Sequence, residues 1–404
     1  MRLFRHLSFV WIALGHLAVD ILSGLVPVLL AVLSTPLGLT NALIGLVSAV
    51  YSLAGALPQP AFGWLADRFG TKWTTAAGVL WMAVLFTLVP WLPGRWVLAV
   101  LILAGFGSAA FHPSGASKAS EDGNRFLPGG AATATALFFL FGQAGGAVGP
   151  ALGGLLVDHL GLMGVLALTS LALLVGVAVA SPSASRRDQR PERHPFPDAE
   201  KASAPRARNL TAFLLIVSLA TLRFWAQSST QTFTPLLYKD LGYTPTSYGS
   251  IAAMFMVGVV AGGVLGGVLG DRWGNRRTVV LSFALGVIPF YLFPAARGIS
   301  LLVLIALAGV FNGAPNSILV TMAQRELPGR AGLASGMTLG LMFALGAVGV
   351  YFSGLLADKI GLAPVLQANA LLTLGALLVS ALAYRREARR LISTVIRARF
   401  RHST

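Results

Sequence analysis

Apolar stretches of roughly twenty residues recur along the whole sequence, and this is the length that a helix needs to cross a lipid bilayer. Backbone groups in the hydrocarbon core find no water to bond, so each stretch is predicted to be a helix. Only 11% of the residues are charged, against 55% that are hydrophobic. The fold class predicted is therefore an all-α integral membrane protein with twelve transmembrane helices. These spans 1 to 12 are residues 8–33, 42–65, 74–92, 96–117, 131–156, 162–180, 210–236, 247–269, 278–296, 299–322, 332–356 and 363–384.

The basic residues are distributed unevenly between the two sides of the predicted bundle. A net charge of +16 in a soluble chain would suggest a nucleic-acid partner. Here 25 of the 30 Lys and Arg residues precede span 1 or follow an even-numbered span. By the positive-inside rule, both termini then lie in the cytoplasm and the protein is a multi-pass component of the inner (cytoplasmic) membrane. We expect the lipid bilayer as its environment, no nucleic-acid partner and a monomeric chain.

The sequence also contains an internal repeat. GWLADRFGTKW at 63–73 aligns with GVLGDRWGNRR at 267–277, and GLLVDHLGL at 154–162 aligns with GLLADKIGL at 354–362. A repeat that contains an even number of spans predicts two pseudo-symmetric six-helix halves related by an axis along the membrane normal. The expected domains are an N-terminal half at 1–180, a cytoplasmic, basic and Pro-rich linker at 181–209, a C-terminal half at 210–384 and a cytoplasmic basic tail at 385–404. The tail suits either an amphipathic helix on the anionic inner leaflet or a solubilising segment without a defined fold.

Two six-span halves that each carry a G-x-L-A-D-R-x-G-like motif after their second span resemble the major facilitator superfamily of transporters. The resemblance covers the whole chain and implies transport by alternating access. It implies a conformational role for the motif, because glycines permit close packing and tight turns while the acid can meet a helix N-terminus or a base as the cytoplasmic side closes. The residues concerned are Gly63, Asp67, Arg68, Gly70 and Lys72 in the first copy and Asp271 and Arg272 in the second.

Span 5 contains GGAVGPALGG at 145–154, which fits the G-x-x-x-G-P-x-x-G-G pattern of the superfamily's antiporters. Its glycines allow close helix packing, and Pro150 removes a backbone donor and kinks the helix. The corresponding stretch of span 11, at 346–354, lacks the proline. This asymmetry favours efflux by antiport, with Gly149 and Pro150 in a gating role, although generic packing of small residues is the alternative.

Within the superfamily the chain is most similar to the fosmidomycin-resistance efflux family. His-x-x-x-Asp at 16–20, Gln-Pro at 59–60 and Phe-His-Pro at 111–113 carry this resemblance. The family usually follows Phe-His-Pro with Glu and then Arg, whereas this chain has Ser114 and Lys118. That departure argues against a pairing between a carboxylate and His112 within span 4.

Asp20 is the only one of the fourteen acidic residues placed deep inside a span. It lies about 18 Å along the helix from Ser8, at roughly 1.5 Å per residue, which is close to the bilayer midplane. An intramembrane carboxylate is costly and marks a functional site, and His16 lies one turn before it on the same helix face. We predict that Asp20 and His16 take up a proton, with His112 either as a further proton relay or satisfying a nearby carbonyl.

Arg223 is the only basic residue at a comparable depth, in span 7, which the repeat makes equivalent to span 1. We therefore predict that Arg223 and Asp20 either approach one another or face one cavity, with Arg223 binding an anionic group of the substrate. A fixed ion pair that only orients the halves is the alternative. Further polar and aromatic residues are expected at the substrate, and two of them, Gln143 and Asn312, could instead join helices. The full set is Gln59, Gln143, Phe224, Trp225, Gln227, Gln231, Asn312 and Asn316.

These observations predict a proton-coupled exporter that moves a small anionic or amphiphilic compound, with the compound and protons as its partners. Alternatives are a proton-coupled uptake symporter or a lipid or lysolipid transporter on the same fold, and, outside transport, a membrane sensor. The sequence has no nucleophile elbow, metal-ligand cluster such as His-Glu-x-x-His, or nucleotide-binding loop. We therefore expect no enzymatic activity, no cofactor and no metal.

Overall fold

The computed structural model describes residues 3–127, 129–181, 210–326 and 331–401, and its regular elements there are all helical. Four short 3₁₀ turns are also present: η1 (Leu3–Arg5), η2 (Val89–Trp91), η3 (Gly161–Gly164) and η6 (Phe293–Ala295). The first group of α-helices is α1 (Leu7–Ser34), α2 (Asn41–Ala56), α3 (Gln59–Phe69), α4 (Thr71–Leu88), α5 (Trp96–Phe126), α6 (Ala131–Leu160) and α7 (Val165–Ala180). The second group is α8 (Leu210–Asp240), α9 (Pro245–Trp273), α10 (Asn275–Leu292), α11 (Gly298–Gly313), α12 (Asn316–Glu326), α13 (Ala331–Ile360) and α14 (Leu362–Arg401).

The predicted fold class is confirmed. Eleven helical stretches of the described residues are long and apolar enough to cross a membrane, and the longest of them, Ala131–Ala180, contains both α6 and α7. The structure therefore matches the twelve predicted spans in order and position.

Two predicted spans are broken near a proline. Span 2 divides into α2 and α3 at Pro58, and span 10 divides into α11 and α12 at Pro315. Proline lacks the backbone N–H that would continue the helical hydrogen bonds, which explains both breaks.

Helix α5 continues past the predicted end of span 4 at residue 117. The extra turns bury Asp122, which is 1% exposed, and its carboxylate lies 3.0 Å from the ammonium of Lys118. The hydroxyl of Ser8, at the start of α1, donates to the same carboxylate at 2.6 Å. Asp122 is therefore buried within a helix beyond the end predicted for span 4, and its ion pair offsets the cost of leaving water.

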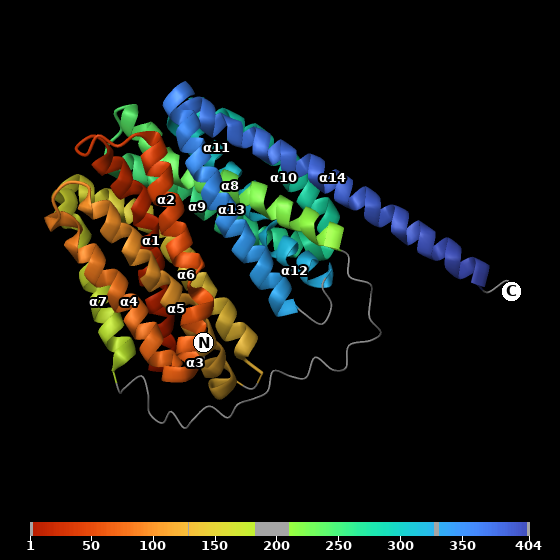
Figure 1. Cartoon of the computed structure of the whole chain (residues 1–404), viewed down its shortest axis with the longest axis horizontal. Coiled ribbons are helices and arrows are strands. Elements are labelled where there is room, and N and C mark those ends of the chain that lie inside the picture. Colours follow the sequence, from red (N-terminus) through yellow and green to blue (C-terminus); the bar gives the residue numbers. More distant parts are fainter. Residues whose placement is uncertain (1–2, 128, 182–209, 327–330, 402–404) are drawn as a thin grey trace.

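The helices form two groups whose members pack mainly on one another. In the first group α1 packs along α6 and α4 along α5, and in the second group α9 packs along α11 and α8 along α14 (Figure 1). Between the groups, α2 packs along α13 and α6 along α9. The predicted linker at 181–209 lies outside the described residues apart from Ser181, and the backbone at 385–401 continues α14 as a helix.

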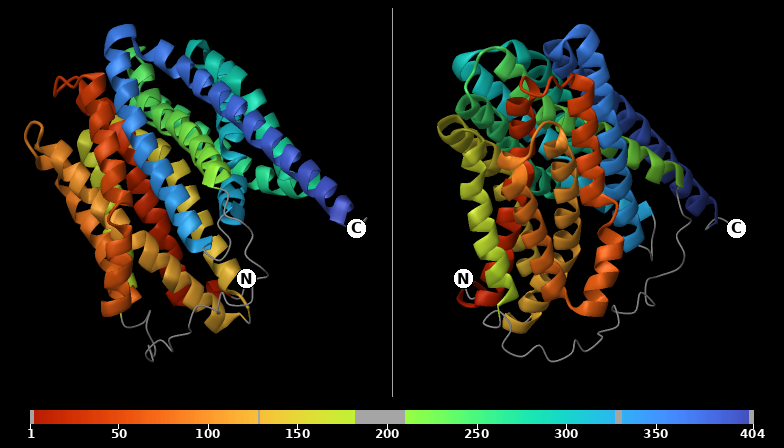
Figure 2. Two further views of the ribbon diagram at one scale, coloured as in Figure 1. Left: turned by 45° about the vertical axis from the view of Figure 1, so that its right-hand side comes forward. Right: turned by 60° about the vertical axis from the view of Figure 1, so that its left-hand side comes forward.

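The two halves touch at one end of the bundle, which we call the closed end. There the backbones meet so closely that a Cβ atom on Gly249 would collide with the carbonyl of Pro150, and one on Gly354 with the carbonyl of Asn41. From this end the helices of the two halves diverge toward the end that carries Ala180 and Leu210, which we call the linker end (Figure 2).

A lysine adds to the contact at the closed end. Lys239, near the end of α8, donates to the hydroxyls of Ser34 at 2.8 Å and Thr35 at 2.7 Å, both at the end of α1. The closed end is therefore held by polar bonds as well as by close backbone packing.

Candidate functional site

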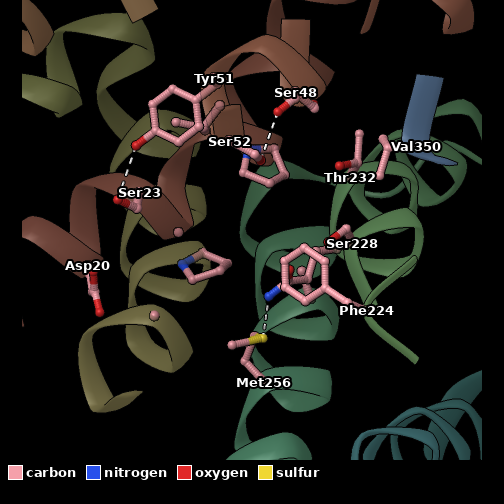
Figure 3. A pocket seen from close by; sticks show the side chains of 17 residues that line it. Asp20, Ser23, Ser48, Tyr51, Ser52, Phe224, Ser228, Thr232, Met256 and Val350 are labelled. Atoms are coloured by element: carbon pink, nitrogen blue, oxygen red, sulfur yellow. Dashed lines mark hydrogen bonds between the residues drawn. The ribbon is translucent and has the colours of Figure 1, made fainter. Parts of the chain in front are cut away.

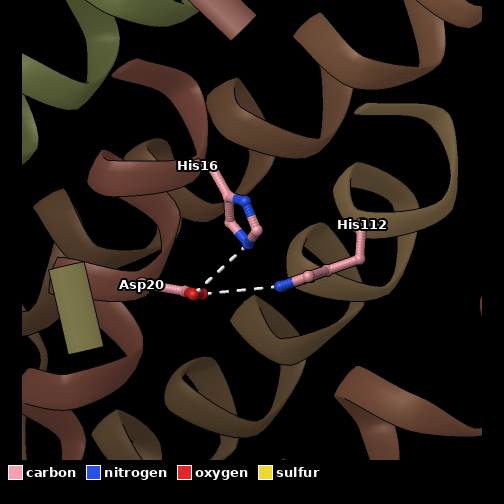
Figure 4. A group of neighbouring side chains, drawn as sticks. All are labelled: His16, Asp20 and His112. Atoms are coloured by element: carbon pink, nitrogen blue, oxygen red, sulfur yellow. Dashed lines mark ion pairs between the residues drawn. The ribbon is translucent and has the colours of Figure 1, made fainter. Parts of the chain in front are cut away.

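Three titratable side chains converge between α1 and α5. The Nε2 atom of His16 lies 3.4 Å from one carboxylate oxygen of Asp20, and the Nε2 atom of His112 lies 3.5 Å from the other (Figure 4). The side chain of His16 is 3% exposed, against 21% for Asp20 and 26% for His112. The carboxylate that His112 lacks within its own span is thus supplied by span 1, a contact that the sequence reasoning did not find.

The other ring nitrogen of each histidine contacts a backbone carbonyl. The Nδ1 atom of His16 lies 2.8 Å from the carbonyl oxygen of Phe138 on α6, and the Nδ1 atom of His112 lies 2.8 Å from that of Ser108. A carbonyl oxygen can only accept, so each Nδ1 atom carries a hydrogen. In His112 the two readings predicted from sequence coexist, since one nitrogen satisfies a carbonyl while the other faces Asp20.

This geometry leaves room for a shared proton between Asp20 and the two imidazoles. With hydrogens on both Nδ1 atoms, neutral His16 and His112 present only lone pairs to Asp20, and an ionised carboxylate presents only lone pairs in return. Three acceptors that meet without a hydrogen between them repel each other. A hydrogen on Asp20 or on a facing Nε2 atom removes this repulsion. The three side chains can therefore share a proton.

The same three residues offer atoms within 4.8 Å of one another, which is compact enough for a metal ion. Two imidazoles and one carboxylate form a donor set that transition metals accept. A chelation control therefore belongs in any functional test of His16, Asp20 and His112.

A cavity of about 220 Å³ lies between the two halves, beside Asp20 (Figure 3). Its lining comes from α1, α2 and α6 on one side and from α8, α9 and α13 on the other. Asp20 is the one acidic residue of the lining, which contains no Glu, Lys, Arg or His. Hydroxyl groups dominate the remaining polar lining, and they belong to Ser23, Ser48, Tyr51, Ser52, Ser228 and Thr232.

One of these hydroxyls is unpaired. Ser48 is 9% exposed and its Oγ atom has no hydrogen-bond partner among the described residues. By contrast, the Tyr51 hydroxyl donates to Ser23 at 3.0 Å. A buried polar atom without a partner is costly, so Ser48 is suited to a hydrogen bond with a ligand in the cavity.

Arg223 does not pair with Asp20, and it does not line this cavity. The expectation of a shared cavity is therefore wrong for this conformation. Arg223 is 3% exposed, and its guanidinium donates to Gln227 at 2.9 Å, to the side chain of Asn312 at 3.2 Å and to Asn316 at 3.0 Å. It has no acidic partner within the described residues.

The other residues predicted to bind substrate divide into two groups. Phe224 and Gln231 line the cavity, which agrees with their expected position. Asn312 donates from its side-chain amide to the carbonyl of Arg223 at 3.1 Å, so it joins α11 to α8, as its alternative reading proposed. Trp225 donates to Ser353 at 2.9 Å.

Two predicted glutamines lie outside the cavity lining. Gln59, at the start of α3, donates to the carbonyl of Gly55 near the end of α2 at 2.9 Å. Gln143 is exposed on α6. Neither position supports a contact with a ligand in the cavity in this conformation.

The repeated motif after span 2 lies at the linker end. Gly70 and Gly274 have φ values of +97° and +91°, a conformation that favours glycine, and each ends a helix. A Cβ atom at Gly63 would meet only the side chain of Pro113 at 3.9 Å, so the expectation that Gly63 permits close packing is wrong. Arg68 lies over the rings of Trp64 and Phe69, and Lys72 over that of Trp73.

The small residues of span 5 pack α6 on both sides. A Cβ atom at Gly149 would crowd the backbone of Ile21 on α1, and one at Gly154 would collide with the backbone of Pro245 on α9. Pro150 lines the cavity. Helix α6 therefore contacts both α1, which carries His16 and Asp20, and α9 of the other half.

A sequence profile of the Major Facilitator Superfamily matches residues 12–238 and 216–399. The fosmidomycin resistance protein of Escherichia coli (strain K12) is 29% identical over 86% of this chain and 85% of its own length. An uncharacterized MFS-type transporter of Bacillus subtilis (strain 168) is 25% identical over 89% of each chain. A bacterial homolog of the human lysosomal transporter Spinster, solved in an inward-facing and occupied conformation, superposes with a TM-score of 0.76 at 14% identity, covering 93% of this chain and 96% of that one.

Proposed function

This chain belongs to the major facilitator superfamily, and from that premise we propose that it exports a small anionic or amphiphilic compound in exchange for protons. The observation that carries the proposal is the cluster of His16, Asp20 and His112, in which two imidazoles face one carboxylate and which reaches the cavity through Asp20. A proton site that shares a wall with a substrate cavity lets the two ligands compete, and such competition is the basis of antiport.

The conformation supports loading from the cytoplasm. The positive-inside rule assigns the linker end to the cytoplasm, so the closed end faces outward. With the outer side shut and the halves diverging toward the linker end, this is the conformation in which an exporter takes up its substrate. Export follows when the halves rock about the cavity and open the closed end.

Arg223 supports an anionic group on the substrate. Its guanidinium is buried and its acceptors within the described residues are neutral, while its Nε atom has no partner there. A buried cation without a counterion is costly, and an anion that reached it during the transport cycle would repay that cost. Phe224, the next residue along α8, lines the cavity, so Arg223 lies next to the cavity wall in the chain.

The test is transport by everted membrane vesicles, with labelled fosmidomycin as the first probe because a relative is named for resistance to it. We expect accumulation that depends on an inward-acidic proton gradient and collapses when an uncoupler dissipates that gradient. Asp20→Asn should abolish the gradient-dependent part. Asp240→Asn, which removes a carboxylate that does not line this cavity, is the matched control and should transport normally.

Accumulation that survives the uncoupler, or gradient-driven accumulation in Asp20→Asn, would refute the proton coupling. If fosmidomycin is not moved, a thermal-shift screen of the purified protein with anionic antibiotics, sugars and lysolipids identifies the next probe, because a ligand that binds the folded state raises its melting temperature. Gradient-driven accumulation in right-side-out vesicles would indicate an uptake symporter instead.

A further inference from the structure

At the closed end, two carboxylates each accept hydrogen bonds from the other half. The first belongs to Asp358, at the end of α13. Its two oxygens accept from the backbone N–H groups of Asn41 at 2.8 Å and Ala42 at 3.0 Å. These residues begin α2, where the first N–H groups have no acceptor within the helix. The hydroxyl of Thr40 accepts from Leu43 at 3.1 Å, so Asp358 completes a cap that the N-terminal half begins.

The second carboxylate belongs to Asp158, at the end of α6, and it meets the start of α9. It accepts from the backbone N–H of Thr246 at 3.3 Å and from the hydroxyl of Thr246 at 2.6 Å. Pro245 has no N–H to offer, and the Thr246 hydroxyl takes its place as the second donor. Thr244 caps the same turn by accepting from Ser247 at 3.4 Å.

The sequence repeat relates these two contacts. Asp158 and Asp358 occupy the same position of the repeated GLL-x-D-x-x-GL motif, and Thr40 and Thr244 occupy the same position before α2 and α9. In each case a helix of one half ends with an acid that caps the first turn of a helix of the other half. A carboxylate at a helix N-terminus is stabilised both by the free N–H groups and by the helix dipole.

At the linker end, a second pair of repeated acids makes no such bonds within the described residues. Asp67 and Asp271 are also equivalent in the repeat, yet both are exposed and neither bonds to the other half within the part of the chain that the structure describes. Of the two pairs of repeated acids, one is engaged where the halves touch and the other is free of such contacts where they diverge. In this conformation, therefore, the repeated acids at the closed end bond to the other half, and those at the linker end do not within the described residues.

We propose that Asp158 and Asp358 form a closed-end latch that holds the outer side of the cavity shut, and that both bonds break in a single opening step. The proposal rests on the alternating access of the proposed function. Because each half is a packed body, rocking one against the other separates both contacts at once. The contributions of Asp158 and Asp358 to the opening equilibrium therefore multiply, although the two contacts lie on different helix pairs.

The absence of cysteine from the chain makes a thiol accessibility test direct. Ser228→Cys places one thiol in the cavity, and a membrane-impermeant maleimide added at the closed-end side reaches it only when that end opens. We expect Asp158→Ala and Asp358→Ala each to raise the labelling rate about fivefold, as the loss of one helix cap predicts. The double variant should label about twenty-fivefold faster.

Ser300→Ala is the control, because Ser300 is exposed at the start of α11 and its hydroxyl donates to the carbonyl of Arg297 in its own half at 2.7 Å. Its labelling rate should equal that of the parent. Ile299→Cys, which is 76% exposed at the start of α11, verifies that the vesicles present the closed end to the reagent. If the alanine variants do not fold, Asp158→Asn and Asp358→Asn keep the size and one acceptor oxygen and should give a smaller rise.

A double variant that labels at the parent rate would overturn the latch, and a double variant that labels no faster than either single one would overturn the joint opening step. The labelling uses neither substrate nor proton gradient. A failed transport assay with a normal labelling response would therefore count against the proposed substrate or coupling and leave the latch standing.

Discussion

Gly142 tests whether the proton cluster depends on the close approach of α6 to α1. A Cβ atom built on Gly142 overlaps the imidazole ring of His16, and all three of its nearest neighbours are atoms of that ring. The ring cannot easily move, because its Nδ1 atom is bonded to the Phe138 carbonyl and its centroid lies 4.0 Å from that of the Phe138 ring. Gly142→Ala must therefore either turn the imidazole or separate the helices.

The cost follows from these two outcomes. Overpacking a tight contact costs about 1–3 kcal/mol. Turning the ring leaves the Nδ1 hydrogen of His16 buried without an acceptor, which also costs about 1–3 kcal/mol. Replacing a helical glycine with alanine returns up to about 1 kcal/mol. We expect a net loss of about 2 kcal/mol of unfolding free energy for Gly142→Ala.

Gly146 provides the control on the same helix. A Cβ atom there would meet only the methyl group of Met256 at 3.8 Å, an ordinary contact. Gly146→Ala should thus keep the gain in helix propensity. Its unfolding free energy should be about 3 kcal/mol greater than that of Gly142→Ala. Thermal unfolding of the purified proteins in one detergent measures the difference, and vesicle transport measures the effect on coupling. Equal melting temperatures with normal gradient-dependent transport in Gly142→Ala would refute the reasoning.

Three further predictions follow from buried charges. Asp122→Ala should destabilise the protein by about 3 kcal/mol, since Lys118 keeps only Glu121 at 3.8 Å, and removing both charges with Lys118→Met and Asp122→Leu should recover most of the loss in a thermal melt. Arg223→Met should melt no lower than the parent, because it removes a buried cation without an acidic partner in the described residues, yet export of an anionic substrate in the vesicle assay should be lost. Treatment with a chelator should leave vesicle transport unchanged, and a loss that an added metal ion restores would reassign the histidine cluster to metal binding.

The helices and their order could be predicted because the bilayer leaves few choices. Length and hydropathy alone place all twelve spans, and the repeat organises them. The pairing of His16 with Asp20 could also be predicted, since residues four apart share a helix face. His112 joins them from α5, and no local pattern states which helix faces which.

The orientation of Arg223 could not be predicted for a related reason. The second half of span 7 carries Gln, Ser and Thr residues on every side of the helix, so its sequence does not indicate which face turns toward the cavity. Arg223 and Phe224 are neighbours in sequence but point about 100° apart around the helix, and only Phe224 lines the cavity. The hydroxyls of Ser48 and Ser228 were missed because a single serine in an apolar span resembles a packing residue.

Under the proposed exchange of protons, helix α6 connects the cluster of His16, Asp20 and His112 to the opening of the cavity. Near its start the Phe138 carbonyl holds His16, and at its far end Asp158 caps α9 of the other half. Between these points α6 packs against α1 through Gly145 and Gly149, so it cannot shift along α1 without disturbing Asp20, whose Cβ atom lies beside Gly145. A change of protonation that alters the bond from His16 to Phe138 therefore acts on the same rigid element that carries one arm of the closed-end latch. Under this proposal, a single helix is enough to couple proton release to opening, because α6 carries both contacts.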